Sequence, residues 1–314
     1  MMTALDSPPL GLVLDDIVRR HRPRSEAGSL PANIPHLSSL PFDRFGIAVA
    51  TVSGDVFSAG DADLPFSIQS ISKVFTLAMA LSAGDPAALW SRVLREPSGT
   101  SFNSLVQLEV EHGIPRNPFI NSGALVVTDH LMGRYPDAAG EVLRFLTDQV
   151  GHQSGRKGPF IDEVAARSEL SNSSRNLALA HFLKDFGNLR RPAEAVVANY
   201  VRQCSIMMTC VEMAKAGLFL AQGGRGAFGA VVSRSEAKRI GSVMLTCGMY
   251  DAAGEFAYRV GLPGKSGVGG GILAIVPGEC CICVWSPRLD SKGNSLAGTA
   301  ALADLSDRTG WSVF

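Results

Sequence analysis

The chain has 314 residues, of which 46% are hydrophobic and 18% are charged, and its mean hydropathy is +0.15. This composition provides for a large buried core and excludes an intrinsically disordered protein, which has low hydrophobicity and a high net charge. Lys and Arg number 29 and so do Asp and Glu, and without a basic patch we expect no nucleic-acid partner.

The N-terminal region has none of the features of an export signal. It lacks a basic start, a long apolar stretch and a small-residue cleavage site. No segment approaches the ~18 consecutive apolar residues that span a bilayer, so we expect no membrane partner and a cytoplasmic location. Among the six cysteines, Cys280 and Cys283 form a C-x-x-C within a strand-like run. Residues three apart on a strand face opposite sides, so we expect buried, reduced cysteines rather than a metal site.

The first 40 or so residues are rich in proline and contain one predicted helix, at 11–20. Residues 45–51 and 56–57 flank a Ser-Gly-Asp turn and predict a β-hairpin. From Ser70 to about residue 222, apolar residues recur at helical spacing. The helices predicted there span 73–81, 87–95, 124–132, 141–150, 177–186, 193–200 and 209–220.

Beyond residue 232 the predicted elements alternate again between helix and strand. Ser233, with Glu236 three residues later, is typical of a helix N-cap. Strands are predicted at 255–260, 271–276 and 281–285, and a last helix at 295–305.

Strands near both ends of the chain predict one antiparallel sheet in an α+β fold, flanked by the terminal helices. The central helices then form an inserted, all-helical lobe. We expect residues 1–69 and 232–314 to make the mixed sheet lobe and 70–231 the helical lobe, with the site in the cleft between them.

The first candidate for chemistry is Ser70 with Lys73, at the start of a predicted helix. Residues three apart share one helical face, so the lysine can take the serine proton if burial lowers the lysine pKa. The helix N-terminus adds N–H groups where an oxyanion would form. Taken alone, this pattern is a weak signal, because it is more often a capped helix that carries a surface lysine.

The second candidate is Lys265-Ser266-Gly267, which runs into a glycine-rich turn and an apolar strand. It resembles the K-T-G element of the serine β-lactamases and penicillin-binding proteins, where an edge strand lines the cleft opposite the S-x-x-K helix. The alternative is an ordinary glycine-rich turn. Found in this order in one chain, the two candidates favour acyl transfer.

A set of longer motifs resembles the phosphate-activated and bacterial glutaminases, which have a β-lactamase/transpeptidase-like fold. The set begins with PFSIQSISK at residues 65–73, and the matches extend from about residue 30 to 296. The others are EPSG (96–99) with Phe102-Asn103, NPFINSGA (117–124), Ser168-Glu169 with Arg175-Asn176, CSI (204–206), CGMYD (247–251), GLPGKSGV (261–268), WSP (285–287) and GNS (293–295).

The resemblance implies a glutaminase that hydrolyses the side-chain amide of L-glutamine through a serine acyl-enzyme. Ser70 would be the nucleophile, Lys73 its base, and the N–H groups of Ser70 and Val268 the oxyanion hole. Tyr200 and Tyr250 would relay protons or hold the base and also contact substrate. The remaining substrate contacts would be Gln69, Asn121, Glu169 and Asn176. The resemblance also implies a homodimer or homotetramer.

The chemistry of free glutamine agrees with these assignments. Glu169 can supply an anion for the substrate ammonium, and the neutral amides of Asn121 and Asn176 can donate to its carboxylate. Without the resemblance, Glu169 would be read as a solvated helix residue, the asparagines as capping or turn residues and the tyrosines as core-edge residues. The family usually has a tyrosine where this chain has Asn33, so we expect a changed pocket wall there.

Two other classes of function stay open at this point. One is a β-lactamase or esterase-like serine hydrolase of the same fold, and the other is a catalytically inactive member that acts as a binding protein. None of the six histidines lies in these motifs or shows a metal-ligand spacing, and no dinucleotide or P-loop fingerprint is present. We therefore expect neither a metal nor a cofactor.

Overall fold

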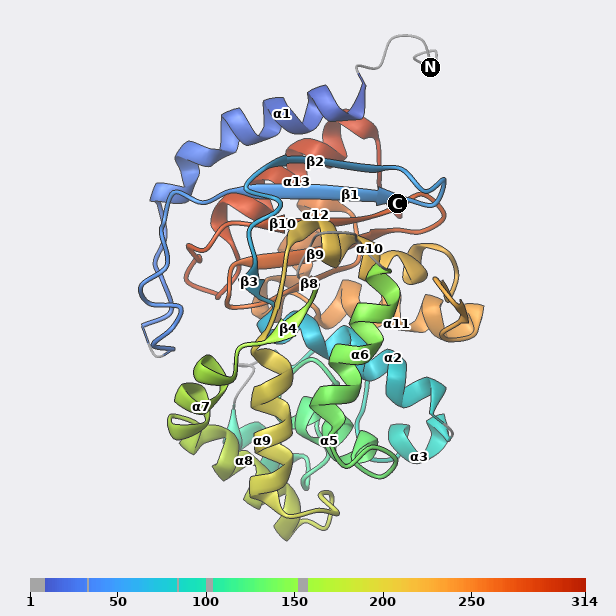
Figure 1. Cartoon of the computed structure of the whole chain (residues 1–314). Helices are drawn as coiled ribbons and strands as arrows, with labels where there is room; N and C mark the ends of the chain where they lie inside the picture. Colours follow the sequence, from blue (N-terminus) through green and yellow to red (C-terminus); the bar gives the residue numbers. More distant parts are fainter. Residues whose placement is uncertain (1–8, 33, 84, 100–103, 152–157) are drawn as a thin grey trace.

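Five antiparallel strands from both ends of the chain form the main sheet, in the order β2-β1-β10-β9-β8 (Figure 1). The structure is a computed structural model that describes residues 9–32, 34–83, 85–99, 104–151 and 158–314. Register pairs Ala48 with Ser58 on one side and with Cys283 on the other, which confirms the predicted joining of the two ends. The strands are β1 (Gly46–Thr51), β2 (Val56–Gly60), β8 (Gly264–Ser266), β9 (Gly271–Val276) and β10 (Cys280–Trp285).

Each face of this sheet is covered by its own hydrophobic core. On one face, α1 (Leu10–His21), α12 (Ala253–Val260) and α13 (Leu296–Thr309) pack over alternate strand residues. On the other face lies α10 (Cys210–Ala221), which contacts β1, β9 and β10. Cys280 belongs to the first core and Cys283 to the second, so the expected alternation is confirmed. All six cysteines are buried and free.

The central helices form a separate group below the sheet in Figure 1 and share one continuous core with α10. Within the described residues no helix has the length and apolar character needed to cross a membrane. The helices of this group are α2 (Ser72–Ser82), α3 (Pro86–Trp90), α4 (Leu105–Val110), α5 (Asn121–Leu131), α6 (Ala138–Val150), α7 (Glu163–Ser171), α8 (Ser174–Asp185) and α9 (Ala193–Cys204).

A small second sheet and helix α11 (Arg234–Cys247) connect the two groups. A three-stranded sheet in the order β3-β5-β4 ties the segment before α2 to the end of α9. Helix α11 contacts both α2 and β8. The short elements are η1 (Arg22–Glu26), β3 (Phe66–Ser67), η2 (Gln69–Ile71), β4 (Phe160–Ile161), β5 (Ile206–Met208), β6 (Arg225–Gly226), β7 (Gly229–Ala230) and η3 (Tyr250–Ala252).

Most predicted elements are confirmed, but the strand predicted at 255–260 is wrong. This segment belongs to helix α12. Alternation of Phe256, Tyr258 and Val260 favoured a strand, yet Tyr258 is 88% exposed while the other two are buried. The buried set is Ala253, Phe256 and Val260, which is helical spacing. The helix predicted at 87–95 is also shorter and ends at Trp90.

Candidate active site

Ser70 lies in the short η2 turn directly before α2, and its side chain is largely buried. Strand β5 contacts the residue before this turn, because the Ile68 N–H donates to the carbonyl of Ile206 at 2.9 Å. Gln69 has a φ of 47°, a left-handed conformation that is uncommon for a residue other than glycine. Such conformations persist where surrounding contacts fix them, and they cluster at functional sites.

Lys73, in the first turn of α2, is completely enclosed by protein. Its ammonium donates to the carbonyl of Phe119 at 3.1 Å and to Oδ1 of Asn121 at 2.8 Å. The Tyr200 ring lies below it, with 5.6 Å between Nζ and the ring centroid. Burial lowers the pKa of Lys73 to about 8, because the charged form loses its hydration.

Asn121 joins Lys73 to two further side chains from different helices. Oδ1 of Asn121 also accepts from the Tyr200 hydroxyl on α9 at 3.1 Å. Its Nδ2 donates to Oδ1 of Asn176 on α8, also at 3.1 Å. The Asn176 amide is thereby oriented with its NH2 group away from Asn121. Burial raises the pKa of Tyr200 well above its usual value, so this hydroxyl stays a neutral donor.

Glu169 approaches the same region from α7. Nε2 of Gln69 donates to Oε2 of Glu169 at 3.2 Å. Burial raises the pKa of Glu169, and the bond from Gln69 acts in the opposite direction. A partly buried carboxylate that is hydrogen-bonded to a neutral amide attracts a cation strongly.

Tyr250 and Lys265 close the site from the sheet side. The Tyr250 side chain hydrogen-bonds with Ser70, and its hydroxyl also donates to the carbonyl of Ser266 at 3.4 Å. Burial raises the pKa of Tyr250 to about 12. Lys265 donates to the same carbonyl at 2.6 Å and lies 4.6 Å from the centroid of the Tyr250 ring. Burial, and then the charge of Lys73, holds the pKa of Lys265 well below its usual value.

The glycine-rich turn between β8 and β9 packs directly on the Ser70 segment. A Cβ atom on Gly267 would lie 2.6 Å from the carbonyl oxygen of Ile68 and 3.3 Å from the Ser70 nitrogen. Val268 follows in this turn. In the described part of the chain, neither the Ser70 N–H nor the Val268 N–H donates to another group. Two such donors can receive an oxyanion.

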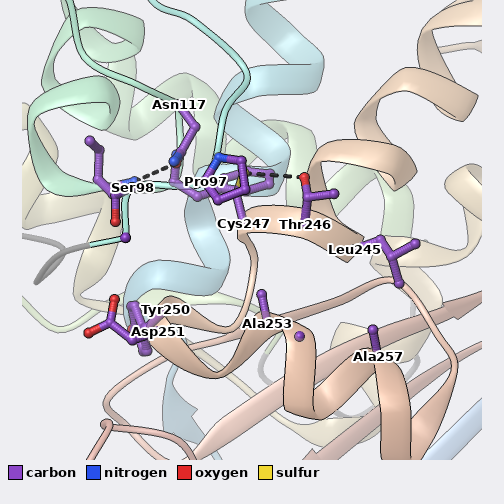
Figure 2. A pocket seen from close by; sticks show the side chains of 14 residues that line it. Pro97, Ser98, Asn117, Leu245, Thr246, Cys247, Tyr250, Asp251, Ala253 and Ala257 are labelled. Carbon is purple, nitrogen blue, oxygen red and sulfur yellow. Dashed lines mark hydrogen bonds between the residues drawn. The ribbon is translucent and has the colours of Figure 1, made fainter. Parts of the chain in front are cut away.

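A cavity of about 490 Å³ adjoins this site, with Tyr250 in its wall (Figure 2). Its walls come from the end of α11, from η3 and α12, and from the segments around Pro97 and Asn117. Of the site residues predicted from sequence, Tyr250 alone lines it within the described chain. Figure 2 shows Asp251 beside Tyr250 at the edge of this cavity.

Comparison with known proteins assigns the family. The chain matches the family described as Glutaminase over residues 28–314. It belongs to the glutaminase family. A glutaminase of Rhizobium meliloti (strain 1021) is 51% identical over 309 residues, or 97% of this chain and 96% of the relative. A glutaminase of Streptomyces coelicolor is 55% identical over 293 residues, or 93% of this chain and 94% of the relative.

Solved structures of glutaminases have the same fold. The probable glutaminase ybaS superposes with a TM-score of 0.91 at 34% identity and covers 100% of this chain and 99% of its own. Mglu in its tris and glutamate form has a TM-score of 0.90 at 38% identity, over 98% of this chain and 68% of its own. The β-lactamase-like α+β fold expected from the motifs is thus confirmed.

Within this glutaminase fold, the side chains predicted as site residues fall into three hydrogen-bonded groups around the α2 N-terminus. One links Lys73, Asn121, Asn176 and Tyr200, a second links Gln69 and Glu169, and the third links Ser70 and Tyr250. Val268 lies in the turn between β8 and β9. The predicted effect of Asn33, and the matched Phe102-Asn103, lie outside the described residues.

Sequence reasoning did not single out two groups that the structure adds. One is the main-chain carbonyl of Phe119, an acceptor for Lys73, and the other is Ser67, which bonds to Gln69. A backbone carbonyl leaves no signal in the side-chain pattern. Within the described chain, no three His, Cys, Asp or Glu side chains group as a metal ion requires.

Proposed function

We propose that this chain hydrolyses the side-chain amide of L-glutamine to L-glutamate and ammonia through an acyl-enzyme on Ser70, with Lys73 as general base. Membership of the glutaminase family supports the reaction. The observation that carries the mechanism is Lys73 itself, buried three residues after Ser70 with its pKa lowered to about 8. A lysine with such a pKa supplies the neutral amine that a general base requires.

The proposed proton transfers use Lys73 and Tyr250. Lys73 takes the Ser70 proton as Oγ attacks the amide carbon, and the N–H groups of Ser70 and Val268 receive the oxyanion. Collapse of the tetrahedral intermediate breaks the C–N bond, and the proton returns from Lys73 to the leaving nitrogen by way of the Tyr250 hydroxyl. Lys73 then takes a proton from water, which attacks the γ-glutamyl ester, and returns this proton to Oγ of Ser70 as the ester bond breaks.

The α-amino and α-carboxylate groups of the substrate would be recognised by the helical group. Glu169 binds the ammonium, and Gln69 supports it through the bond to Oε2. Asn176 donates from its NH2 group to the substrate carboxylate, because Oδ1 of Asn176 already accepts from Asn121. Tyr200 holds Asn121 in place through its hydroxyl and presents its ring to the Lys73 ammonium.

The acyl-enzyme is tested by rapid quenching of the wild type with L-glutamine, followed by mass spectrometry of the Ser70 peptide. A γ-glutamyl adduct on Ser70 is expected. Ser70→Ala should keep the fold and lose almost all ammonia release. A Ser70→Ala enzyme with a tenth of the wild-type kcat would show that Ser70 is not the nucleophile.

Recognition of the substrate ammonium is tested by Glu169→Gln. This change should weaken binding of L-glutamine by roughly 2–5 kcal/mol, the range for losing one partner of a buried charge pair. Since Glu169 is not expected to contact the reacting amide, most of the loss should be in KM. An unchanged KM in a folded variant would remove Glu169 from the pocket.

Ammonia release from glutamine and asparagine, with nitrocefin hydrolysis as a second assay, separates the glutaminase from the serine-hydrolase and inactive alternatives.

Three further proposals concern the oligomeric state, the division into lobes and the location of the protein. We propose a homodimer or homotetramer, to be measured by sedimentation, and division into the lobes 1–69 with 232–314 and 70–231. The six free thiols support a reducing cytoplasmic location, which cell fractionation tests.

A further inference from the structure

Ser67, a buried serine that the proposed mechanism does not use, links the main chain of α9 to the substrate pocket. It lies on β3, three residues before Ser70, and is 3% exposed. Its hydroxyl donates to the backbone carbonyl of Cys204 at 3.0 Å. The same oxygen accepts a hydrogen bond from Nε2 of Gln69 at 3.2 Å.

The direction of these two bonds is fixed by the chemistry of the partners. A carbonyl oxygen can only accept, so the single hydroxyl hydrogen of Ser67 is committed to Cys204. Only lone pairs remain for Gln69, which must therefore turn its NH2 group towards Ser67. The second hydrogen on Nε2 then points to Oε2 of Glu169, at 3.2 Å. A flipped amide would set its oxygen against the lone pairs of Ser67 and against the carboxylate.

The main chain of Gln69 is held independently of its side chain. Its carbonyl accepts from Oγ of Ser72 at 2.7 Å and from the Ser72 N–H. Its left-handed φ of 47° is therefore supported at the backbone. What Ser67 adds is the orientation of the side-chain amide.

We propose that Ser67 is a positioning residue for substrate recognition. Its hydroxyl fixes the one orientation of the Gln69 amide in which Gln69 donates to Glu169, and so holds that carboxylate in place for the substrate ammonium. This inference rests on the proposed role of Glu169. Recognition of the substrate α-amino group would then depend also on the hydrogen bond between Ser67 on β3 and the Cys204 carbonyl at the end of α9.

The test is a double-mutant cycle on L-glutamine hydrolysis with Ser67→Ala and Glu169→Gln. Alone, Ser67→Ala should raise KM about tenfold, the effect expected when the Gln69 amide no longer keeps its hydrogen bond to the charged Glu169, and should leave kcat within about twofold. In the Glu169→Gln background the same change should alter KM by less than about twofold, because the carboxylate it serves is gone. If Ser67 had only a structural role, Ser67→Ala would change KM by the same factor in the wild-type and Glu169→Gln enzymes.

Ser205→Ala is the matched control, since Ser205 is fully buried and its hydroxyl donates to the carbonyl of Val201 at 3.0 Å. It should leave KM unchanged. If Ser67→Ala does not fold, Ser67→Cys gives the same cycle, because a thiol is a weak donor. An unchanged KM, or an equal rise in both backgrounds, overturns the inference. An unchanged KM for Glu169→Gln alone instead overturns the proposed role of Glu169.

Discussion

Lys73 has two neutral oxygens as its hydrogen-bond acceptors, the carbonyl of Phe119 and the amide of Asn121. A carboxylate in either place would favour the ammonium form and keep the amine from acting as a base. Burial among neutral groups has the opposite effect and lowers the pKa to about 8. At pH 7 about a tenth of the molecules then carry the neutral amine that Ser70 needs.

The pH dependence of kcat/KM follows from this pKa. Below about 8 the Lys73 amine is protonated and cannot accept the serine proton, so activity should rise with pH and level off above that value. The measurement is kcat/KM for L-glutamine from pH 6 to 10. Asn121→Asp, which replaces a neutral acceptor with an anion, should move the midpoint to higher pH. A wild-type midpoint in the usual lysine range, above about 10, would contradict Lys73 as the base.

The sequence motifs predicted which residues belong to the site, but not which of them are hydrogen-bonded to one another. The motifs pointed to Gln69, Asn121, Glu169 and Asn176 as separate contacts. The structure instead pairs Gln69 with Glu169 and links the two asparagines. Those pairings depend on where η2 approaches α7 and where α5 approaches α8, and no local pattern encodes these tertiary contacts.

The glycine-rich turn between β8 and β9 packs tightly on the segment that carries the nucleophile. A Cβ atom on Gly269 would lie 2.2 Å from the carbonyl oxygen of Ser67, a main-chain atom that cannot rotate away. Gly269 itself is anchored from behind, because its carbonyl accepts from the Trp285 indole at 3.0 Å. The turn can approach Ser70 only without a side chain at this position.

Gly269→Ala should therefore separate the turn from the Ser70 segment and displace the Val268 N–H. We expect kcat to fall by about a hundredfold, the effect of losing one oxyanion donor, with about 1–3 kcal/mol lost in stability. Gly11→Ala on α1 is the control, since a Cβ atom there meets no other part of the described chain within 4 Å. That change should keep activity and add up to about 1 kcal/mol. Equal kcat values in the two variants would contradict the close packing.

Helix α12 shows why some elements escape sequence prediction. Its six residues 255–260 fit both an alternating strand and the end of a helix, and the deciding neighbour is Ala253. Small residues such as Ala253 contribute little to a periodicity. The N-cap at Ser233, in contrast, is confirmed with both bonds of its capping box, because that signal is local.

For the whole molecule, the sheet unites the two ends of the chain and α10 joins the sheet to the helical group. The antiparallel closure could be predicted from strands at both termini, whereas the place of α10 could not. Its apolar residues surround the helix, and its buried set includes Cys210, Met213 and Phe219. A helix that is apolar all round has no single face to indicate its partners.

Gly217 lies where α10 packs against strands β9 and β10 of the sheet. A Cβ atom there would lie 2.6 Å from Sγ of Cys281 on β10 and 3.0 Å from Cδ1 of Leu273 on β9. Gly217→Val should push α10 from the sheet and cost about 1–3 kcal/mol in the free energy of unfolding, measured with urea. Gly241→Val on α11 is the matched control, because its nearest neighbour is Cγ of Pro263 at 4.0 Å.

Since Cys281 provides the nearest atom, Cys281→Ala should recover part of the Gly217→Val loss, and the two changes should not add. Because α10 contacts both the sheet and the helical group, far-UV circular dichroism and tryptophan fluorescence should move to one lower midpoint together. Equal losses for Gly217→Val and Gly241→Val would mean that the contact between α10 and β10 does not limit stability. Two separate midpoints would mean that α10 does not couple the sheet to the helices.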